Sequence, residues 1–308
     1  MSRAPRRPNP APVPEGVGTT LDPHSLLAAL GRGRAARVEP VRGGWDTTIW
    51  RVELDGAAYA LRLFRAEQRA AAAYEALAMR TAAAAGLPVP RVEAEGTWGD
   101  RPVVLIGWCP GQTLADEVAA RPWRVWQLGL ASGATQARIH RIPVPEPLRT
   151  DSRPWIEWAG PEQTALHDLL QAIAGPDRLL HLDYHPLNVL TDGRGVTGVI
   201  DWVNARVGDP RADLARTIAI IRLAPPPPGL LGPGVAALRR LLELAWRRGY
   251  AAIAGPPRAM APFFAWAGAV MLRDLSPKLG RPGVPLAEAD LHRIRTWTHN
   301  WRLRAGLV

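Results

Sequence analysis

The segment from His181 to Asp201 restricts the possible folds of this chain more than any other feature. It reads HLDYHPLNVLTDGRGVTGVID. Two apolar stretches flank a turn at residues 192–195, and this pattern predicts a β-hairpin. Because strands joined by a short turn pair their far ends, Asp201 should return beside Asn188, with Asp183 in the loop just upstream. Local geometry alone therefore predicts that one carboxamide and two carboxylates converge.

This trio suits phosphoryl transfer. Magnesium prefers oxygen ligands, and one or two side chains plus nucleotide phosphates usually complete its coordination. Asn188 and Asp201 can supply such ligands, while Asp183 can orient an incoming hydroxyl and accept its proton. The spacing H-x-D-x-x-x-x-N is also that of the kinase catalytic loop, with Asp201 in the place of the metal-binding Asp of the next motif. The alternative is a surface hairpin whose polar residues only shape turns and caps, which does not require all these residues together.

Three motifs in this region resemble those of a known family. The loop from His181 to Asn188 resembles the H-G-D-x-H-x-x-N loop of the aminoglycoside phosphotransferase and choline kinase family. Residues 199–202 (VIDW) and 208–215 (GDPRADLA) are similar to that family's I-D-[WF] and G-D-P-x-x-D-L-A motifs. The likeness extends over about residues 38–300. It departs from the family at Leu182, which replaces the commoner glycine, with little expected effect because this side chain need not touch substrate.

The resemblance implies an α+β, bilobal protein-kinase-like fold, and the patterns along the chain agree. Asp55-Gly56 predicts a two-residue hairpin turn, and an Ala-rich helix over residues 67–85 should end at Gly86. Five strands are predicted, at residues 38–41, 48–54, 58–64, 91–97 and 102–106. They should form an antiparallel sheet with the helix after its third strand.

Beyond Gly107 the pattern becomes mainly helical. Helices are predicted at residues 113–119, 123–142, 161–173, 210–223, 234–253, 258–275 and 286–304, with another short one at 23–30. The hairpin is the single strand pair predicted among them, and the Pro225–Pro228 run predicts a stiff loop. We therefore expect a disordered tail (1–22), a nucleotide-binding lobe (23–107) and a helical catalytic and acceptor-binding lobe (108–308).

Nucleotide contacts follow from the resemblance. In kinase-like folds a basic side chain on the third strand holds the phosphates, and a helix glutamate positions it. Arg62 and Glu75 occupy those places, so the resemblance implies an Arg62–Glu75 pair. Arginine is not equivalent to the usual lysine, because its guanidinium is wider and binds phosphate as a fork. The alternative for Arg62 is an exposed strand residue.

Two further segments are expected to meet the nucleotide. Gly43 and Gly44 lie at the first hairpin, where the family's phosphate-covering loop sits and bare amides can approach phosphates closely. The segment that includes Trp108 and Cys109 should be the hinge that donates backbone hydrogen bonds to the base. ATP is the default nucleotide, with GTP left open, and Mg²⁺ is the expected metal.

The residue inventory excludes several other enzyme classes. Lys278 is the only lysine, so no G-x-x-x-x-G-K-[ST] phosphate-binding loop exists. It lies in a predicted loop, a poor place for a Schiff base. Cys109 is the only cysteine, which rules out an internal disulfide and a cysteine-clustered metal site. The longest apolar run, residues 261–272, is too short to span a bilayer, and the N-terminus lacks an apolar signal segment, so we expect a cytoplasmic protein with no membrane partner.

The net charge of +10 is unevenly distributed. Residues 203–308 hold 16 basic and 6 acidic side chains, whereas residues 1–202 hold 22 of each. Nucleic acid is one conceivable partner of this basic third, but solvated arginines on helices explain it more simply. Polycationic aminoglycosides need a carboxylate-lined pocket, so a small-molecule hydroxyl acceptor that is neutral or anionic is favoured. A choline-like cation in a tryptophan cage stays open.

Other candidate residues are assigned supporting roles. His181 should anchor its loop by hydrogen bonds, and His185 should shape the loop. Asp209 and Asp213 should tie the metal-binding segment to the helix that follows. A catalytically idle nucleotide-binding or regulatory protein on the same fold is the alternative to an enzyme, although the presence of the catalytic trio argues against it.

Overall fold

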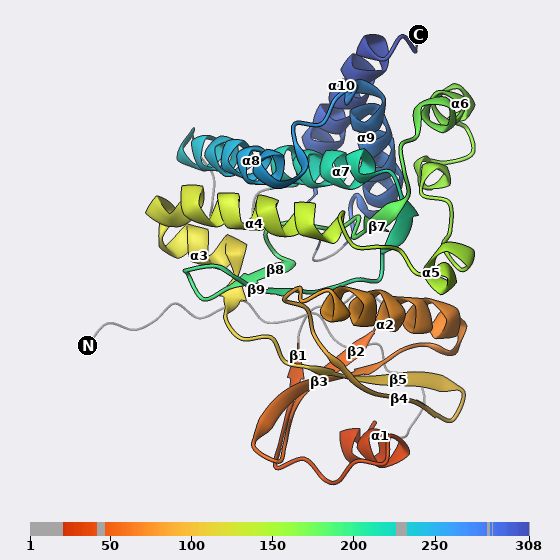
Figure 1. Ribbon diagram of the computed structural model, residues 1–308, viewed down its shortest axis with the longest axis vertical. Helices are drawn as coiled ribbons and strands as arrows, with labels where there is room; N and C mark the ends of the chain where they lie inside the picture. Colours follow the sequence, from red (N-terminus) through yellow and green to blue (C-terminus); the bar gives the residue numbers. More distant parts are fainter. Residues whose placement is uncertain (1–20, 42–46, 226–232, 282–283, 285, 308) are drawn as a thin grey trace.

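The structure, a computed structural model, describes residues 21–41, 47–225, 233–281, 284 and 286–307. Figure 1 shows two lobes, one built on a β-sheet and one mainly helical. The sheet is antiparallel, with strand order β1-β2-β3-β5-β4. The elements of this lobe are α1 (Pro23–Ala29), β1 (Arg37–Val41), β2 (Thr48–Leu54), β3 (Ala57–Leu63), α2 (Arg69–Ala84), β4 (Val92–Trp98) and β5 (Arg101–Gly107). The predicted α+β, bilobal fold class is confirmed.

The turn between β2 and β3 is formed by Asp55 and Gly56, as predicted. Both residues have positive φ angles, +50° and +78°. A two-residue hairpin turn of this kind matches the right-handed twist of the strands and favours Asp-Gly. Turn chemistry therefore sets the register of the β2–β3 pair, in which Leu54 faces Ala57.

The two faces of the sheet pack against different helices (Figure 1). Side chains alternate along a strand, so Leu61 and Leu63 of β3 join the cluster that includes Leu26 and Leu27 of α1. Ala60 and Phe64 point the other way and join the cluster that contains α2 residues. Arg62 has the same parity as Ala60 and Phe64. Alternation therefore directs Arg62 toward α2 and the interlobe side.

The second lobe is helical, with short strands near the lobe boundary. Its elements are β6 (Gln112–Thr113), α3 (Leu114–Ala120), α4 (Val125–Ile139), α5 (Glu146–Thr150), α6 (Thr164–Ile173), β7 (Arg178–Leu180), β8 (Val189–Thr191), β9 (Val196–Val199), β10 (Arg206–Gly208), α7 (Pro210–Leu223), α8 (Pro233–Ala254), α9 (Ala261–Leu275) and α10 (Glu288–Arg304). Every helix predicted here is present, with small shifts at the ends. Most of the predicted Pro225–Pro228 loop lies outside the described residues.

The prediction of a single strand pair in this lobe is wrong. The β8–β9 hairpin is present, but β6 also pairs with β8, and β10 pairs with β7. The helix α5 was not predicted either. These elements are too short to show a hydrophobic period, and the strands form because distant segments meet.

The linker between the lobes passes very close to the hairpin. Gly111 has φ +102°, and a Cβ atom there would overlap the carbonyl oxygen of Thr191 in β8. A glycine is therefore required at this crossing. Among the described residues, no helix is long and apolar enough to cross a membrane.

Candidate active site

The catalytic loop, defined as residues 181–188, connects β7 to β8. Its backbone is held by hydrogen bonds to Asp213 of α7. Asp213 is fully buried, and its Oδ2 accepts from the backbone N–H of His181 (3.0 Å) while Oδ1 accepts from that of Leu182 (2.8 Å). His140 Nε2 lies 2.9 Å from Oδ2. Burial alone would raise the pKa of Asp213, but the hydrogen bond and charge of His140, followed by His181, lower it. Asp213 thus ties α7 to the loop before the hairpin, whereas the sequence suggested a tie to the segment after it.

Leu182 occupies strained backbone. Its φ is +59°, in the left-handed region that favours glycine. The side chain is fully buried among the apolar residues of α7 and α9. Arg216 Nε donates to its carbonyl oxygen at 3.3 Å. The leucine therefore combines a backbone suited to glycine with packing that glycine lacks.

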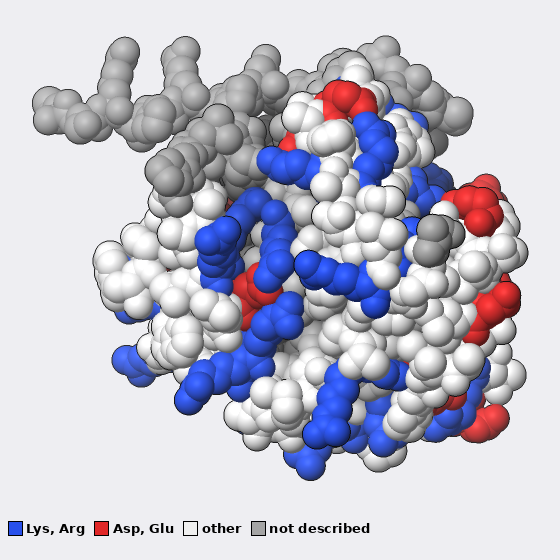
Figure 2. All heavy atoms as spheres, turned by 90° about the horizontal axis from the view of Figure 1, so that it is seen from above, with Lys and Arg blue, Asp and Glu red and all other residues white. Residues whose placement is uncertain are grey.

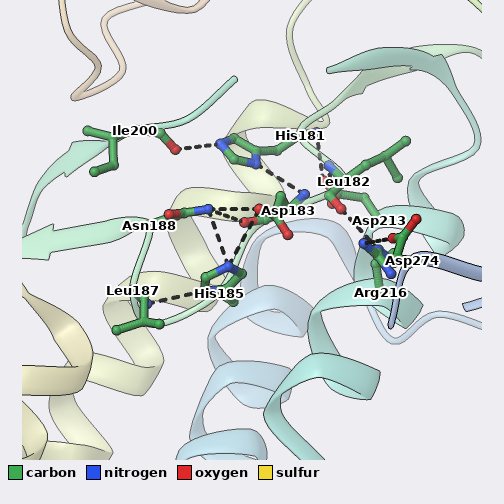
Figure 3. A network of polar contacts seen from close by, with 10 residues as sticks. All are labelled: His181, Leu182, Asp183, His185, Leu187, Asn188, Ile200, Asp213, Arg216 and Asp274. Atoms are coloured by element: carbon green, nitrogen blue, oxygen red, sulfur yellow. Dashed lines mark hydrogen bonds and ion pairs between the residues drawn. The ribbon is translucent and has the colours of Figure 1, made fainter. Parts of the chain in front are cut away.

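His181 connects the catalytic loop to the strand that leads to Asp201 (Figure 3). Its Nδ1 accepts from the N–H of Asp183 at 3.3 Å, so Nε2 carries the proton that it donates to the carbonyl of Ile200 at 3.0 Å. Burial lowers the pKa of His181, against the opposing charges of Asp213 and then Asp183. The residue is therefore a neutral anchor, in agreement with the role expected from the sequence.

Asp183, Asn188 and His185 form a compact polar group (Figure 3). The Asn188 amide donates to the Asp183 carbonyl (3.0 Å) and to its Oδ2 (3.1 Å). His185 Nε2 lies 3.5 Å from Asp183 Oδ2, and its Nδ1 accepts from the N–H of Leu187 at 3.2 Å. Sequence reasoning assigned His185 only a loop-shaping role. In the sequence, the i, i+2 spacing of Asp183 and His185 indicates that the two side chains lie close together.

The electrostatics of this group keep Asp183 ionised. Burial would raise its pKa, but the hydrogen bond and charge of His185, then the charges of Arg216 and His181, lower it to about 2. With this pKa Asp183 is a carboxylate at all physiological pH values. It is therefore suited to accept a hydrogen bond from a hydroxyl.

Asp201 follows the end of β9 (Val199) by two residues. Its φ is +65°, and its surface is exposed. Protein atoms nevertheless crowd the carboxylate, and this desolvation, followed by repulsion from Glu75 and Asp183, raises its pKa to about 6. Arg62 and His185 offset part of the effect. The structure thus brings Asp201 within electrostatic range of the catalytic loop and of α2.

Arg62 and Glu75 form the ion pair that the resemblance implied. Arg62 Nη1 lies 2.6 Å from Glu75 Oε1, and both side chains are buried. The guanidinium also lies over the ring of Phe64, 4.8 Å from its centroid. Two buried atoms of the pair, Arg62 Nε and Glu75 Oε2, have no hydrogen-bond partner among the described residues. A buried donor without a partner is suited to an anionic oxygen such as that of a phosphate.

The other expected nucleotide contacts are only partly described. Gly43 and Gly44 lie outside the described residues. The amide of Trp108 donates to the carbonyl of Ala58 at 3.1 Å, so it is already engaged by β3. The amide of Cys109 makes no hydrogen bond within the described part of the chain. Burial raises the pKa of the Cys109 thiol to about 11, which keeps it neutral.

A magnesium–nucleotide complex fits the side chains that are present. Both amide protons of Asn188 are engaged by Asp183 and its neighbours, so the carbonyl Oδ1 faces away from them (Figure 3). Asp201 adds a carboxylate whose pKa is raised first by desolvation and then by repulsion from Glu75 and Asp183. Oxygen donors in a negative environment suit Mg²⁺. Asn188 and Asp201 could hold the metal, and Arg62 the phosphates.

A third group lies on the α7 and α9 side of Asp183 (Figure 3). Arg216 is buried and forms an ion pair with Asp274 of α9 at 3.1 Å. The Trp158 indole N–H donates to Asp274 Oδ1 at 3.2 Å, and the Arg216 guanidinium lies 4.8 Å from the Trp158 ring centroid. Sequence reasoning did not find Arg216 or Asp274. Nothing in their spacing indicates that three distant segments meet beside the catalytic loop.

The bilobal fold, with Asp183, Asn188 and Asp201 in one lobe and the Arg62–Glu75 pair in the other, is typical of kinase-type phosphotransferases. Residues 37–255 match the model of the phosphotransferase enzyme family (APH), and this chain belongs to that family. No curated protein matches it significantly.

Solved structures share the fold at low sequence identity. The ternary complex of a thermostable mutant of aminoglycoside phosphotransferase APH(4)-Ia with AMP-PNP and hygromycin B is 18% identical, with TM-score 0.62 over 92% of this chain and 97% of that one. Amicoumacin kinase hAmiN, in complex with AMP-PNP, Ca²⁺ and Ami, is 13% identical, with TM-score 0.62 over 88% and 89%. Macrolide 2'-phosphotransferase MphH from Brachybacterium faecium is 17% identical, with TM-score 0.54 over 89% and 97%.

Proposed function

We propose that this phosphotransferase moves the γ-phosphate of ATP to a hydroxyl group of a small molecule, with Mg²⁺ as cofactor. The observation that carries the proposal is the convergence of Asp183, Asn188 and Asp201 opposite the Arg62–Glu75 pair. Solved structures of the same fold contain AMP-PNP, which favours ATP as donor. We assign nucleotide binding to residues 23–107 and acceptor binding to residues 108–308.

The catalytic contribution of Asp183 is orientation followed by proton acceptance. Its carboxylate would accept a hydrogen bond from the acceptor hydroxyl and align the oxygen with the γ-phosphorus. As the new O–P bond forms and the bond to the bridging oxygen of ADP breaks, the hydroxyl proton becomes acidic and passes to Asp183. Because the pKa of Asp183 is lowered, its carboxylate is a weak base, and we expect it to receive the proton late, as the O–P bond forms.

Charge neutralisation comes from the nucleotide side. Magnesium would offset charge on the phosphates and the leaving group. Arg62, held by Glu75, would donate to the phosphates through its unpaired Nε. His185 keeps Asp183 and Asn188 in place, since it lies within 3.5 Å of both. These side chains position the reactants and require no covalent intermediate.

The acceptor is expected to be neutral or anionic, although the solved structures of the same fold include a complex with hygromycin B and an amicoumacin kinase. Beside Asp183, the carboxylate of Asp274 is already paired with Arg216 and Trp158, so it supplies no excess negative charge. Figure 2 shows basic side chains predominating on much of the face at the end of the C-terminal lobe. A polycation that bound beside Asp274 would lose hydration, and this paired carboxylate could not offset that cost.

Phosphate transfer from labelled ATP to a panel of hydroxyl compounds tests this function. Neutral sugars, alcohols and anionic hydroxy compounds should be phosphorylated in preference to kanamycin-type compounds. The substitution Asp183→Asn should lower kcat by about 10²–10⁴-fold while nucleotide binding persists. Asp100→Asn, an exposed carboxylate in the turn before β5, is the matched control and should leave kcat unchanged. Equal activity of both variants would contradict the role of Asp183.

A catalytically idle nucleotide-binding protein is the alternative. It would be favoured if nucleotide stabilised the protein but no compound, and no water molecule, accepted phosphate from ATP. Hydrolysis of ATP by the wild type that is lost in Asp183→Asn would exclude it, because water can replace the acceptor.

A further inference from the structure

A cavity lies between α2 and the helical lobe, and no residue of the catalytic trio lines it. It has a volume of about 560 Å³, within the range typical of small-molecule sites. One wall is the outer face of α2, with Ala70, Ala73, Tyr74 and Leu77. The other wall comes from the helical lobe, with Asp151, Arg153, Val203, Asn204 and Arg206. None of the residues of the proposed active site lines it.

Two arginines dominate the charge of this cavity. Arg153 and Arg206 both line it, together with one carboxylate, Asp151. Burial and then the charge of Arg153 lower the pKa of Arg206, so the two guanidinium groups lie within electrostatic range of each other. Within the described part of the chain, neither guanidinium forms an ion pair with a carboxylate, and Arg206 donates only to the carbonyl of Ala205.

The walls of the cavity are held by specific contacts. The hydroxyl of Tyr74 donates to the carbonyl of Leu148 at 3.1 Å, which joins α2 to α5. Ser152 Oγ accepts from the N–H of Val207 at 2.8 Å, which holds the segment with Arg153 against β10, next to Arg206. The segments that carry these two like charges are therefore held together by a hydrogen bond between a side chain and the backbone, rather than by an ion pair with a shared carboxylate. A bound anion would relieve their repulsion.

We propose that this cavity binds a phosphate group carried by a small molecule, at a site separate from the catalytic trio. Two guanidinium forks match the oxygens of a phosphate, which they can bind in bidentate fashion. The apolar wall on α2 would contact the body of the ligand. The ligand would bridge α2, which carries Glu75, and the segment that follows Asp201. The proposal does not depend on phosphotransfer, because it concerns binding alone.

Thermal unfolding without nucleotide or metal tests the site. The probes are inorganic phosphate, glucose 6-phosphate and glucose, with chloride added to constant ionic strength. At about ten times the Kd, a phosphate-bearing probe should raise the Tm of the wild type by about 2–4 °C. At equal concentrations of the two probes, a larger shift with glucose 6-phosphate would identify a phosphomonoester, whereas equal shifts would identify free phosphate as sufficient. Any shift with glucose should be the same in the wild type and in Arg153→Gln, because glucose carries no phosphate.

Single-charge variants locate the binding. Arg153→Gln and Arg206→Gln should each weaken phosphate binding at least tenfold, measured against the Tm of each unliganded variant. Arg240→Gln, an exposed position on α8 that loses the same charge, should bind like the wild type. If Arg206→Gln fails to fold, Arg153→Gln carries the test, since Arg153 is exposed. No shift in the wild type, or equal shifts in the Arg153 and Arg240 variants, would overturn the proposal.

Discussion

Individual residues of the catalytic loop show opposing physical demands. Leu182 has a backbone conformation that costs an L-residue about 1–2 kcal/mol, yet its side chain is completely buried. Packing of a leucine is worth about 2–5 kcal/mol. Packing therefore outweighs strain, which explains how a leucine is tolerated where related loops have glycine. From the sequence, leucine in place of glycine is expected to have little effect because this side chain need not touch substrate. In the structure, the exchange bears instead on the stability of the fold.

Two substitutions at Leu182 separate strain from packing. Leu182→Ala loses the packing but keeps the strain, so it should destabilise by about 2–5 kcal/mol. Leu182→Gly loses the same packing but relieves about 1–2 kcal/mol of strain, so it should be the more stable of the two. In urea unfolding, the free energy of unfolding should be largest for the wild type, smaller for Leu182→Gly and smallest for Leu182→Ala. If Leu182→Ala proved more stable than Leu182→Gly, the left-handed backbone would not be strained.

The charge of Asp213 should make stability depend on pH. Because the pKa of this carboxyl is lowered in the folded protein, ionised Asp213 stabilises the fold above its unfolded pKa of about 3.9, and the contribution is lost as pH falls through the folded value. Asp213→Asn should cost about 3 kcal/mol at pH 7, and the difference from the wild type should shrink below about pH 4. Denaturant titrations at pH 7 and below about pH 4 measure this difference in the free energy of unfolding. Asp100→Asn is the control and should match the wild type at each pH.

At the scale of elements, the close contact of α4 and α8 supports the catalytic loop. A Cβ on Gly133 of α4 would overlap the carbonyl oxygen of Trp246 in α8. The approach brings Trp246 Nε1 to 2.8 Å from Gln136 Oε1 and its ring to 5.1 Å from that of Tyr184. Tyr184 lies in the catalytic loop, and its hydroxyl donates to the carbonyl of Ser132 at 2.9 Å. The helix pair thus forms the support on which the loop rests.

A methyl group at this helix crossing tests that support. Gly133→Ala should destabilise the protein by about 1–3 kcal/mol or more, because the backbones must separate. Gly234→Ala on α8 is the matched control, since a Cβ there meets no atom within 4 Å, and helix propensity should leave stability equal or slightly higher. Urea midpoints compare them. Equal losses in the two variants would mean that the crossing is not tightly packed.

At the scale of the whole molecule, the two lobes each hold half of the proposed nucleotide site. Arg62 and Glu75 belong to the sheet lobe, while Asn188 and Asp201 belong to the helical lobe. Magnesium–ATP would contact both halves and link them. Ligand that binds only the folded protein stabilises it, so the link can be measured without knowing the acceptor.

Magnesium should therefore increase the stabilisation that ATP provides. We expect ATP with Mg²⁺ to raise the Tm of the wild type by about 2 °C or more beyond ATP alone. Asp201→Ala should lose the magnesium-dependent part, as should the wild type in EDTA. Asp100→Asn should retain it. A magnesium effect of equal size in Asp201→Ala would place the metal elsewhere.

Much of this arrangement could be read from the sequence because it depends on short-range rules. Turn chemistry predicted the Asp55-Gly56 hairpin and the hairpin that joins Asn188 to Asp201. The two-residue period of β3 directs Arg62 to the side of the sheet where α2 carries Glu75. Helix patterns were equally informative, and the bounds of α7 were predicted in full. In each case neighbours in the sequence determine the geometry.

Other features depend on contacts between distant segments, so only the tertiary structure could decide them. Arg216, Asp274 and Trp158 come from three separate segments, and their meeting beside Asp183 follows from how α7 and α9 pack. The same is true of the cavity between Arg153 and Arg206. By itself the sequence predicted a phosphotransferase and the hairpin between Asn188 and Asp201, because local geometry and short motifs suffice there. Packing alone decided what surrounds that hairpin, since side chains far apart in the chain have no shared period or turn.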